Sequence, residues 1–300
     1  MKIKVASRTS KLAIAQVEII MKASGIEEYE IIKVKTKGDY QSEKGVIMFD
    51  KSNFVDEIDD IVLSGEADIG IHSGKDVPAK SYKNLETYHY DEGTNNNSFY
   101  KDILIFKNSK KAFFEPHMTV GTSSLRRKMQ ALHFLKAKSV ENLNGNIDTR
   151  INLLNQGHFD WIILALAGCT RLNFNLNYVT LDHLTPLTQG KIAVRLRHNS
   201  KEKWWYAKIK KLSDNRSEEY SLVNDFLNRV EADCHSAIAV DCQKNIDNSF
   251  EMKVEAYGVK NFIKINSNGF YDECLKQAVN SFSSNGGEEL LNEHNWDKSS

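Results

Sequence analysis

A carboxylate follows an apolar segment at residues 67–78, ADIGIHSGKDVP, where the chain places Lys75 and Asp76 just before Pro78. The alternating apolar residues before them predict a buried strand. A carboxylate fixed at a strand end can stabilise a cation that forms during a reaction, and it can move a proton. The plainer interpretation is a loop ion pair of little energetic weight, so these two residues alone do not decide the function.

Cationic and hydroxyl side chains follow five further predicted strands. They stand in RTSK (8–11), TK (36–37), GTSSLRR (121–127), NGNIDTR (144–150) and at Arg171. The planar fork of arginine binds carboxylates and phosphates bidentately, and helix N-termini add free N–H groups and partial positive charge. Taken singly, each group could be an N-cap or a solvated surface charge. Together, at the strand ends of an α/β sheet, they predict a site for a polyanion.

The elements that must position these residues alternate between strand and helix over the first 170 residues or so. The first unit is predicted to contain strands at 2–7, 29–36 and 67–73 and helices at 10–25 and 53–66. The second unit is predicted to contain strands at 101–107, 118–124, 139–146 and 160–168 and helices at 123–138 and 149–157. Ser10 is predicted to cap the first helix and Gly25 to end it. The alternation predicts βαβ units with a parallel sheet, without the GxGxxG motif of a dinucleotide-binding fold.

The later part of the chain has a different pattern. Residues 201–220 are highly charged and are interpreted as a surface connection. After them, a helix at 221–234, strands at 237–244, 250–260 and 261–268 and a helix at 271–282 predict a small α+β domain. Residues 40–53 have no clean periodicity, and we expect a mobile loop, or a lid, there.

Composition and charge argue against several classes of protein. The 40 acidic and 40 basic residues balance to a net charge of zero, which disfavours a nucleic-acid binder. No apolar run approaches the roughly 18–20 residues of a membrane span, and the N-terminus lacks the apolar core of a signal peptide. We therefore expect a cytoplasmic protein that binds neither nucleic acid nor membranes. The four cysteines are widely spaced and form no CxxC pair, which predicts free thiols rather than disulfides or a metal site.

Seven segments, in this order and spacing, resemble the porphobilinogen deaminase family, also called hydroxymethylbilane synthase, over nearly the whole chain. They are RTSKLAIAQ (8–16), TKGD (36–39), ADIGIHSGKDVP (67–78), GTSSLRR (121–127), NGNIDTR (144–150), ILALAGCTRL (163–172) and FLNRVEADC (226–234). The resemblance implies two α/β domains like the halves of periplasmic binding proteins, at 1–95 with 190–208 and at 99–186. It also implies a small α+β C-terminal domain at 214–300.

The activity that this resemblance implies is the stepwise deaminative polymerisation of porphobilinogen into the linear tetrapyrrole hydroxymethylbilane. This is a transferase reaction of porphyrin and haem biosynthesis, and we expect a monomer to carry it out. The product would grow on a dipyrromethane cofactor linked as a thioether to Cys234, and Asp76 matches the family's catalytic aspartate. Cys169, Cys242 and Cys274 are expected to be small buried side chains.

The resemblance also assigns the remaining site residues. Cofactor-binding positions are matched by Lys75, Thr122, Ser124, Arg126, Arg127, Asn146 and Arg150, and substrate-binding positions by Arg8, Ser10, Gln16 and Arg171. His72 fits the site less clearly and is expected only to support the strand end. No metal is implied.

Several positions in or near this site depart from the family's pattern. Asn144 stands where arginine is usual, residues 50–53 replace a glycine-rich stretch, and Ala232 and Asp233 stand in place of two glycines. Lys191 stands where the family has a small residue. We hypothesise that Lys191 supplies the positive charge missing at Asn144, and the simpler alternative is a lysine that points to solvent.

The alternative function is a non-catalytic, two-lobed protein that binds small anions. The first two domains alone would fit that function. The third domain, with Cys234, favours the enzyme.

Overall fold

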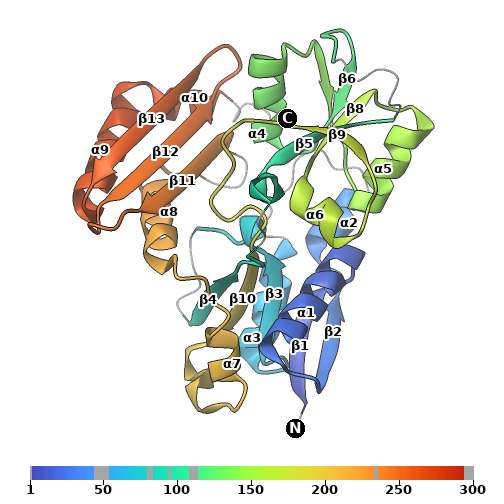
Figure 1. The fold of residues 1–300 in the computed structure, drawn as a ribbon, viewed down its shortest axis with the longest axis vertical. Coiled ribbons are helices and arrows are strands. Elements are labelled where there is room, and N and C mark those ends of the chain that lie inside the picture. The colour runs from blue at the N-terminus through green and yellow to red at the C-terminus, as the bar shows by residue number, and fades with distance from the viewer. Residues whose placement is uncertain are drawn as a thin grey trace.

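Three β-sheets organise the part of the chain that the computed structural model describes, residues 2–43, 54–79, 84–93, 96–107, 114–232 and 236–293. Each sheet belongs to a separate unit, and the units surround the middle of the molecule (Figure 1). No described helix is both long and apolar enough to cross a membrane. The molecule is a mixed α/β protein, as the sequence predicts.

The first sheet has the strand order β2-β1-β3-β10-β4. Its strands are β1 (Ile3–Arg8), β2 (Tyr29–Val34), β3 (Ile69–Ser73), β4 (Leu85–Tyr90) and β10 (Ile192–Arg197). β1 runs parallel to β2 and β3, whereas β10 runs antiparallel to β3 and β4. The prediction of a parallel sheet is therefore wrong for this half of it, because β10 enters from the second unit and runs in the opposite direction.

Helices α1 (Lys11–Ser24) and α3 (Asp56–Ser64) pack against this sheet. Ser10 caps α1 by accepting a hydrogen bond from the Ala13 amide at 3.3 Å, and Gly25 ends it in the left-handed conformation. The sequence-based predictions of Ser10 as the N-cap and Gly25 as the end of this helix are confirmed. A third helix, α2 (Lys37–Glu43), occupies the start of the segment expected to be a loop at 40–53, and residues 44–53 lie outside the described part of the chain.

The second sheet repeats this arrangement with the order β7-β6-β8-β5-β9. Its strands are β5 (Asp102–Phe106), β6 (Thr119–Gly121), β7 (Ser139–Glu141), β8 (Trp161–Ala165) and β9 (Asn177–Thr180). β6 is parallel to β7 and β8, and β5 is antiparallel to β8 and β9, so the prediction of a parallel sheet is again wrong in part.

Three helices belong to the second sheet: α4 (Leu125–Gln130), α5 (Ile147–Gln156) and α6 (Leu166–Arg171). The helix expected at 123–138 is shorter, because one π turn over Ala131–Leu135 follows α4. The strand expected at 160–168 ends at Ala165. Leu166 and Cys169 are buried in the core on one side of α6, and Arg171 is the last residue of this helix rather than the residue after a strand.

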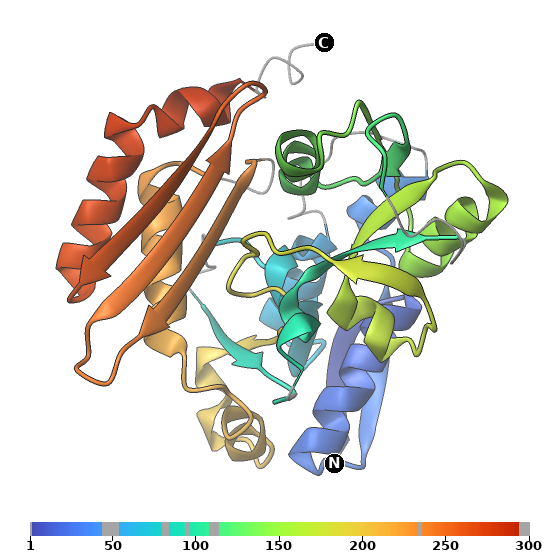
Figure 2. The same ribbon diagram turned by 45° about the horizontal axis from the view of Figure 1, so that its top comes forward.

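The third sheet is an antiparallel meander of β11 (Ile238–Lys244), β12 (Phe250–Tyr257) and β13 (Phe262–Gly269). Its core is shared with α8 (Ser217–Arg229) and α9 (Tyr271–Ser284), through Phe226 and Phe282, whose rings meet edge to face. α9 lies on the side turned away from the other two units (Figures 1 and 2). A short helix, α10 (Gly287–Asn292), follows it.

The charged segment 201–220 is more than a surface connection, so that prediction is wrong in part. It contains α7 (Tyr206–Lys210), which follows a 3-10 segment at His198–Glu202. Trp205 and Ile209 are 2% and 0% exposed and pack into the core of the first sheet. The charges lie between buried apolar residues at helical spacing, and the high local charge conceals that pattern.

We expect Ile209→Ala to lower the free energy of unfolding by about 2–5 kcal/mol, because it leaves a cavity in the core of the first unit. The matched control is Ile246→Ala, at a fully exposed position outside that unit, which should change stability by no more than about 0.5 kcal/mol. Urea titration followed by circular dichroism measures both. Equal effects of the two substitutions would show that α7 does not contribute to the core.

Candidate active site

Asp76 lies in a single 3-10 turn, Gly74–Asp76, that directly follows β3. The turn is held on the segment that re-enters the first sheet, because the Gly74 amide donates to the Lys191 carbonyl at 2.9 Å. A Cβ atom on residue 74 would stand 2.9 Å from the Thr188 carbonyl oxygen, so this close approach requires glycine. Asp76 is half-buried and Lys75 is exposed.

His72 is turned into the protein rather than toward a ligand. Its Nε2 atom lies 3.3 Å from Asp59 Oδ1, and Arg195 Nη1 lies 2.6 Å from Asp59 Oδ2. The three side chains are at most 2% exposed. This geometry matches the supporting role expected for His72.

Four predicted site residues, from both α/β units, lie close enough to influence one another. Arg150 shows this: desolvation, together with the positive charges of Arg127 and Arg8, lowers its pKa to about 10, and the carboxylate of Asp76 partly opposes the shift. Arg8 and Asp76 come from the first unit, and Arg127 and Arg150 come from the second. The structure thus brings the expected catalytic carboxylate and three expected binding cations into one electrostatic cluster.

The two units also touch through helix ends beside this cluster. Lys11 at the start of α1 pairs with Asp148 in the first turn of α5, with 3.2 Å between Nζ and Oδ1. Arg150 donates to the Gly145 carbonyl at 2.7 Å and to Ser123 Oγ at 3.0 Å. Both of these acceptors are neutral, so neither cancels the positive charge of Arg150.

Arg8 has a carboxylate partner that the sequence did not reveal. Arg8 Nη2 lies 2.5 Å from Asp39 Oδ1, and its guanidinium lies 4.0 Å from the centre of the Phe54 ring. The Thr36 amide and hydroxyl donate to the other carboxylate oxygen at 3.0 and 2.9 Å. Burial alone would raise the pKa of Asp39, but the interactions with Arg8 and Thr36 outweigh it and hold that pKa below its usual value. The TKGD motif therefore supplies the counter-charge for Arg8.

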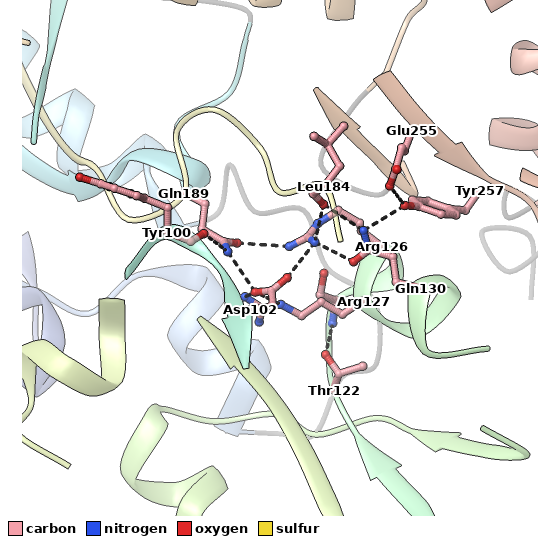
Figure 3. A network of polar contacts seen from close by, with 11 residues as sticks. Tyr100, Asp102, Thr122, Arg126, Arg127, Gln130, Leu184, Gln189, Glu255 and Tyr257 are labelled. Carbon is pink, nitrogen blue, oxygen red and sulfur yellow. Dashed lines mark hydrogen bonds and ion pairs between the residues drawn. The ribbon is translucent and has the colours of Figure 1, made fainter. Parts of the chain in front are cut away.

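Arg126 and Arg127 share one buried carboxylate, Asp102 at the start of β5 (Figure 3). Arg126 Nη1 is 2.8 Å from Asp102 Oδ2, and Arg127 Nη2 is 2.7 Å from Oδ1. Burial would raise the pKa of Asp102, but the two guanidinium groups reverse the effect and hold it well below its usual range.

Arg126 is further bound by three protein acceptors: Gln130 at 2.9 Å, Gln189 at 3.2 Å and the Leu184 carbonyl at 3.5 Å. Gln130 in turn links this network to the third sheet, because its side-chain amide donates a hydrogen bond to Tyr257 Oη at 3.0 Å (Figure 3). The structure thus places Arg126, expected to bind the cofactor, in a network that joins the second and third units.

Arg171 joins the two segments that connect the α/β units, residues 91–101 and 181–191. Its Nε atom donates to Glu92 at 2.8 Å and its Nη2 atom to the Gly190 carbonyl at 2.5 Å. Its side chain is 4% exposed, and burial lowers its pKa although Glu92 opposes this shift. In this conformation Arg171, expected to bind substrate, pairs with Glu92 instead of lying open.

The uncharged polar residues predicted for the site lie at the starts of helices or beside the ends of strands. Ser10 is engaged as the cap of α1, and buried Gln16 donates to Ser73 Oγ at 3.0 Å, which ties α1 to the residue before the Asp76 turn. Thr122 accepts from the Ser124 amide at 3.3 Å. Asn146 stands exposed at the N-cap position of α5.

Lys191 contradicts both sequence-based expectations. It is 4% exposed, so it does not point to solvent. Its ammonium pairs with Asp91 and lies 3.7 Å from Asp214 Oδ2, so its charge is directed at these carboxylates rather than at Asn144. The cysteines expected to be inert, Cys169, Cys242 and Cys274, are buried free thiols, whereas Cys234 and Asp233 lie outside the described residues.

Comparison with known proteins gives one consistent result. Residues 3–204 match the family model for the porphobilinogen deaminase, dipyromethane cofactor binding domain. The chain is 33% identical to a porphobilinogen deaminase from a Nitratiruptor species over 97% of its own length and 96% of the relative's. It is 31% identical to one from Caldicellulosiruptor saccharolyticus over 92% and 96% of the two lengths, and 34% identical to a probable porphobilinogen deaminase from Aeropyrum pernix over 69% and 73%.

Solved structures similar to this chain include the methionine-binding protein MetQ, with a TM-score of 0.43 and 10% identity over 74% of this chain and 94% of that one. They also include the VFT2 domain of BvgS from Bordetella pertussis, with a TM-score of 0.43 and 16% identity over 74% and 91%.

We expect Asp102→Asn to destabilise the protein by about 3–5 kcal/mol, because two buried guanidinium groups lose their shared counter-charge. Since the folded-state pKa of Asp102 is depressed, its contribution is complete above the unfolded value near pH 3.9 and is lost as pH falls through and below it. The wild-type free energy of unfolding should therefore fall more steeply than that of the variant between about pH 5 and pH 2.

Denaturant titrations across this range measure the difference, and Asp160→Asn, at an exposed carboxylate of the same unit, is the control. Parallel pH profiles of wild type and Asp102→Asn would contradict the role assigned to the Asp102 pair.

Proposed function

The chain belongs to the porphobilinogen deaminase family, and we propose that it joins porphobilinogen units stepwise into hydroxymethylbilane with Asp76 as its catalytic residue. The observation that carries the proposal is that Asp76, in the turn after β3, lies close enough to Arg150 for their charges to interact, and that Arg127 and Arg8 also act on Arg150. Porphobilinogen carries acetate and propionate arms, which the arginines can neutralise. A site built only to bind anions would gain nothing from Asp76, which would repel them.

The family is defined by a dipyrromethane cofactor, and the described residues fit such a group. Its carboxylate arms need several cations, and Arg150 donates side-chain hydrogen bonds to a neutral carbonyl and a neutral hydroxyl, so its guanidinium charge is available to such an arm. Arg127, Arg150, Lys75, Thr122, Ser124 and Asn146 would hold it, with Arg126 orienting Arg127 through Asp102. When bound, the cofactor supplies a free pyrrole carbon to which the next unit is joined.

Asp76 would act on the substrate's own charge. The C–N bond of the protonated aminomethyl group of porphobilinogen breaks, ammonia leaves with the bonding electron pair, and the remaining methylene-pyrrole carries the positive charge. A fixed carboxylate near the pyrrole N–H stabilises this cation. After the new C–C bond forms, the carboxylate can receive the proton that the substituted ring carbon loses, and this loss restores the aromatic ring. Arg8, Ser10, Gln16 and Arg171 would bind the incoming substrate, and for Arg171 this requires a substrate carboxylate to take the place of Glu92.

We also infer that the domains follow the limits expected from sequence, 1–95 with 190–208, 99–186 and 214–300. The place of β10 in the first sheet supports the return to the first domain, and the burial of Ile209 in the same core extends that return beyond residue 208. We also propose that the protein acts as a monomer in the cytoplasm.

We expect Asp76→Asn to reduce the rate of porphobilinogen consumption by about 10²–10³-fold, because asparagine keeps the shape but cannot stabilise a cation as a carboxylate does. The thermal midpoint should stay close to that of the wild type. Asp272→Asn, at an exposed position in the first turn of α9, is the control and should retain full activity. Wild-type rates in Asp76→Asn would remove Asp76 from the chemistry.

We expect Cys234 to carry the dipyrromethane. Intact-protein mass spectrometry of protein made in a haem-synthesising host should show the added mass of two condensed pyrrole units, which Cys234→Ser should lack and Cys242→Ala should keep. An unmodified wild-type mass, without colour in Ehrlich's reagent, would favour the alternative of a non-catalytic anion-binding protein.

A further inference from the structure

A buried polar cluster lies where the three units of the chain meet, and it is centred on Lys191. We call Asp91, Tyr100, Lys191, Asp214 and Tyr220 the junction cluster. Asp91 follows β4, Tyr100 precedes β5, Lys191 precedes β10, Asp214 precedes α8 and Tyr220 lies within α8. Segments from all three units therefore contribute to it.

Lys191 supplies the ammonium of the junction cluster, and two guanidinium groups beside the cluster also act on its carboxylates, Arg171 on Asp91 and Arg216 on Asp214. It pairs with Asp91, lies 3.7 Å from Asp214 Oδ2 and stands 4.6 Å from the centre of the Tyr100 ring. The hydroxyl of Tyr100 donates to Asp91, and that of Tyr220 donates to Asp214 at 2.5 Å. Without the ammonium, none of the described cations would pair with both carboxylates, and their mutual repulsion in a largely buried place would weaken the contact between the segments.

The first and third units also meet beside the cluster through the rings of His89 and Tyr220, whose centroids lie 4.0 Å apart. A cavity of about 620 Å³ lies beside the junction cluster, and Gly74, Thr188, Asp214 and Tyr220 all line it. The polar contacts of the cluster, together with a hydrogen bond from the Asp214 amide to the His89 carbonyl at 2.8 Å, therefore fix the relative position of the segments around this cavity.

The backbone of Lys191 connects the junction cluster to the catalytic turn. Its carbonyl accepts the Gly74 amide at 2.9 Å, two residues before Asp76. On the other side of residue 191, the Gly190 carbonyl accepts from Arg171 and Gln189 donates to Asp102 at 3.0 Å. Any displacement of Lys191 therefore acts directly on the turn that carries Asp76.

We propose that Lys191 is a positioning residue for Asp76: its ammonium holds the strand end and the linker to the third unit together, and its carbonyl fixes the catalytic turn relative to them. The inference rests on the catalytic role proposed for Asp76. It also assigns a role to the one departure from the family's pattern that the junction contains, and it links the placement of the third unit to the geometry of the site.

The test compares Lys191→Met, which keeps most of the side-chain volume but removes the charge, with Lys191→Arg, which keeps the charge. We expect Lys191→Met to lower kcat by about 10- to 100-fold, the order of loss that follows a misplacement of about 1 Å. KM should stay within about twofold, since the anion-binding arginines are untouched, and Lys191→Arg should restore most of kcat. Lys201→Met, at an exposed position, is the matched control.

A second readout does not depend on activity. Hydrogen exchange of the Gly74 amide should become about tenfold faster in Lys191→Met, because its acceptor is no longer held in place, and it should be unchanged in Lys201→Met. If Lys191→Met does not fold, Asp214→Asn weakens the same cluster and is measured in the same way.

Unchanged Gly74 exchange in the variant would overturn the proposal, and so would a kcat within threefold of the wild type. If Lys191→Met loses both stability and kcat, and Lys191→Arg does not restore kcat, the role of Lys191 is merely structural and the proposal is overturned as well. If the wild-type protein does not consume porphobilinogen, the proposed function fails, while the exchange measurement still decides whether Lys191 positions the turn.

Discussion

The buried carboxylate of Asp102, shared between Arg126 and Arg127, is the interaction on which the arrangement of the units depends. Two guanidinium groups that are nearly inaccessible to water are tolerable only with a counter-charge. Asp102 supplies it from the first strand of the second sheet, while Arg126 reaches the connecting segment through Gln189 and Gln130 reaches the third sheet through Tyr257. One carboxylate thereby holds two arginines that are predicted for the site and joins elements of separate units.

The cations predicted for the site differ in how far their charge is neutralised. Arg8 has Asp39, Arg171 has Glu92, and Arg126 with Arg127 has Asp102. Arg150 instead donates to a carbonyl and a hydroxyl, and burial, together with the charges of Arg127 and Arg8, lowers its pKa. The protein therefore balances most of the charge that it needs for binding anions, and the positive potential that remains lies at Arg150, close to Asp76.

The sequence allowed the local features to be predicted, and the long-range ones escaped it. Ser10 and Gly25 mark the ends of α1 because capping depends on residues a few positions apart. The direction of β10 and β5, by contrast, depends on strands far away in the sequence. The same holds for the carboxylate partners: Asp39 is 31 residues from Arg8, and Glu92 is 79 residues from Arg171. Such pairs leave no periodic signal, and only the motif containing Asp39 drew attention to any of them.

The position of β10 between β3 and β4 has a consequence for how the protein is made. During synthesis from the N-terminus, β3 and β4 emerge about a hundred residues before the strand that separates them, so the first sheet cannot close until residue 197 has left the ribosome. The strands of the second sheet, at 102–180, form an uninterrupted stretch that is complete earlier. The first sheet is therefore completed after the second sheet, whose strands lie between β4 and β10 in the sequence. Until β10 is available, β3 is an unpaired edge strand that can pair incorrectly.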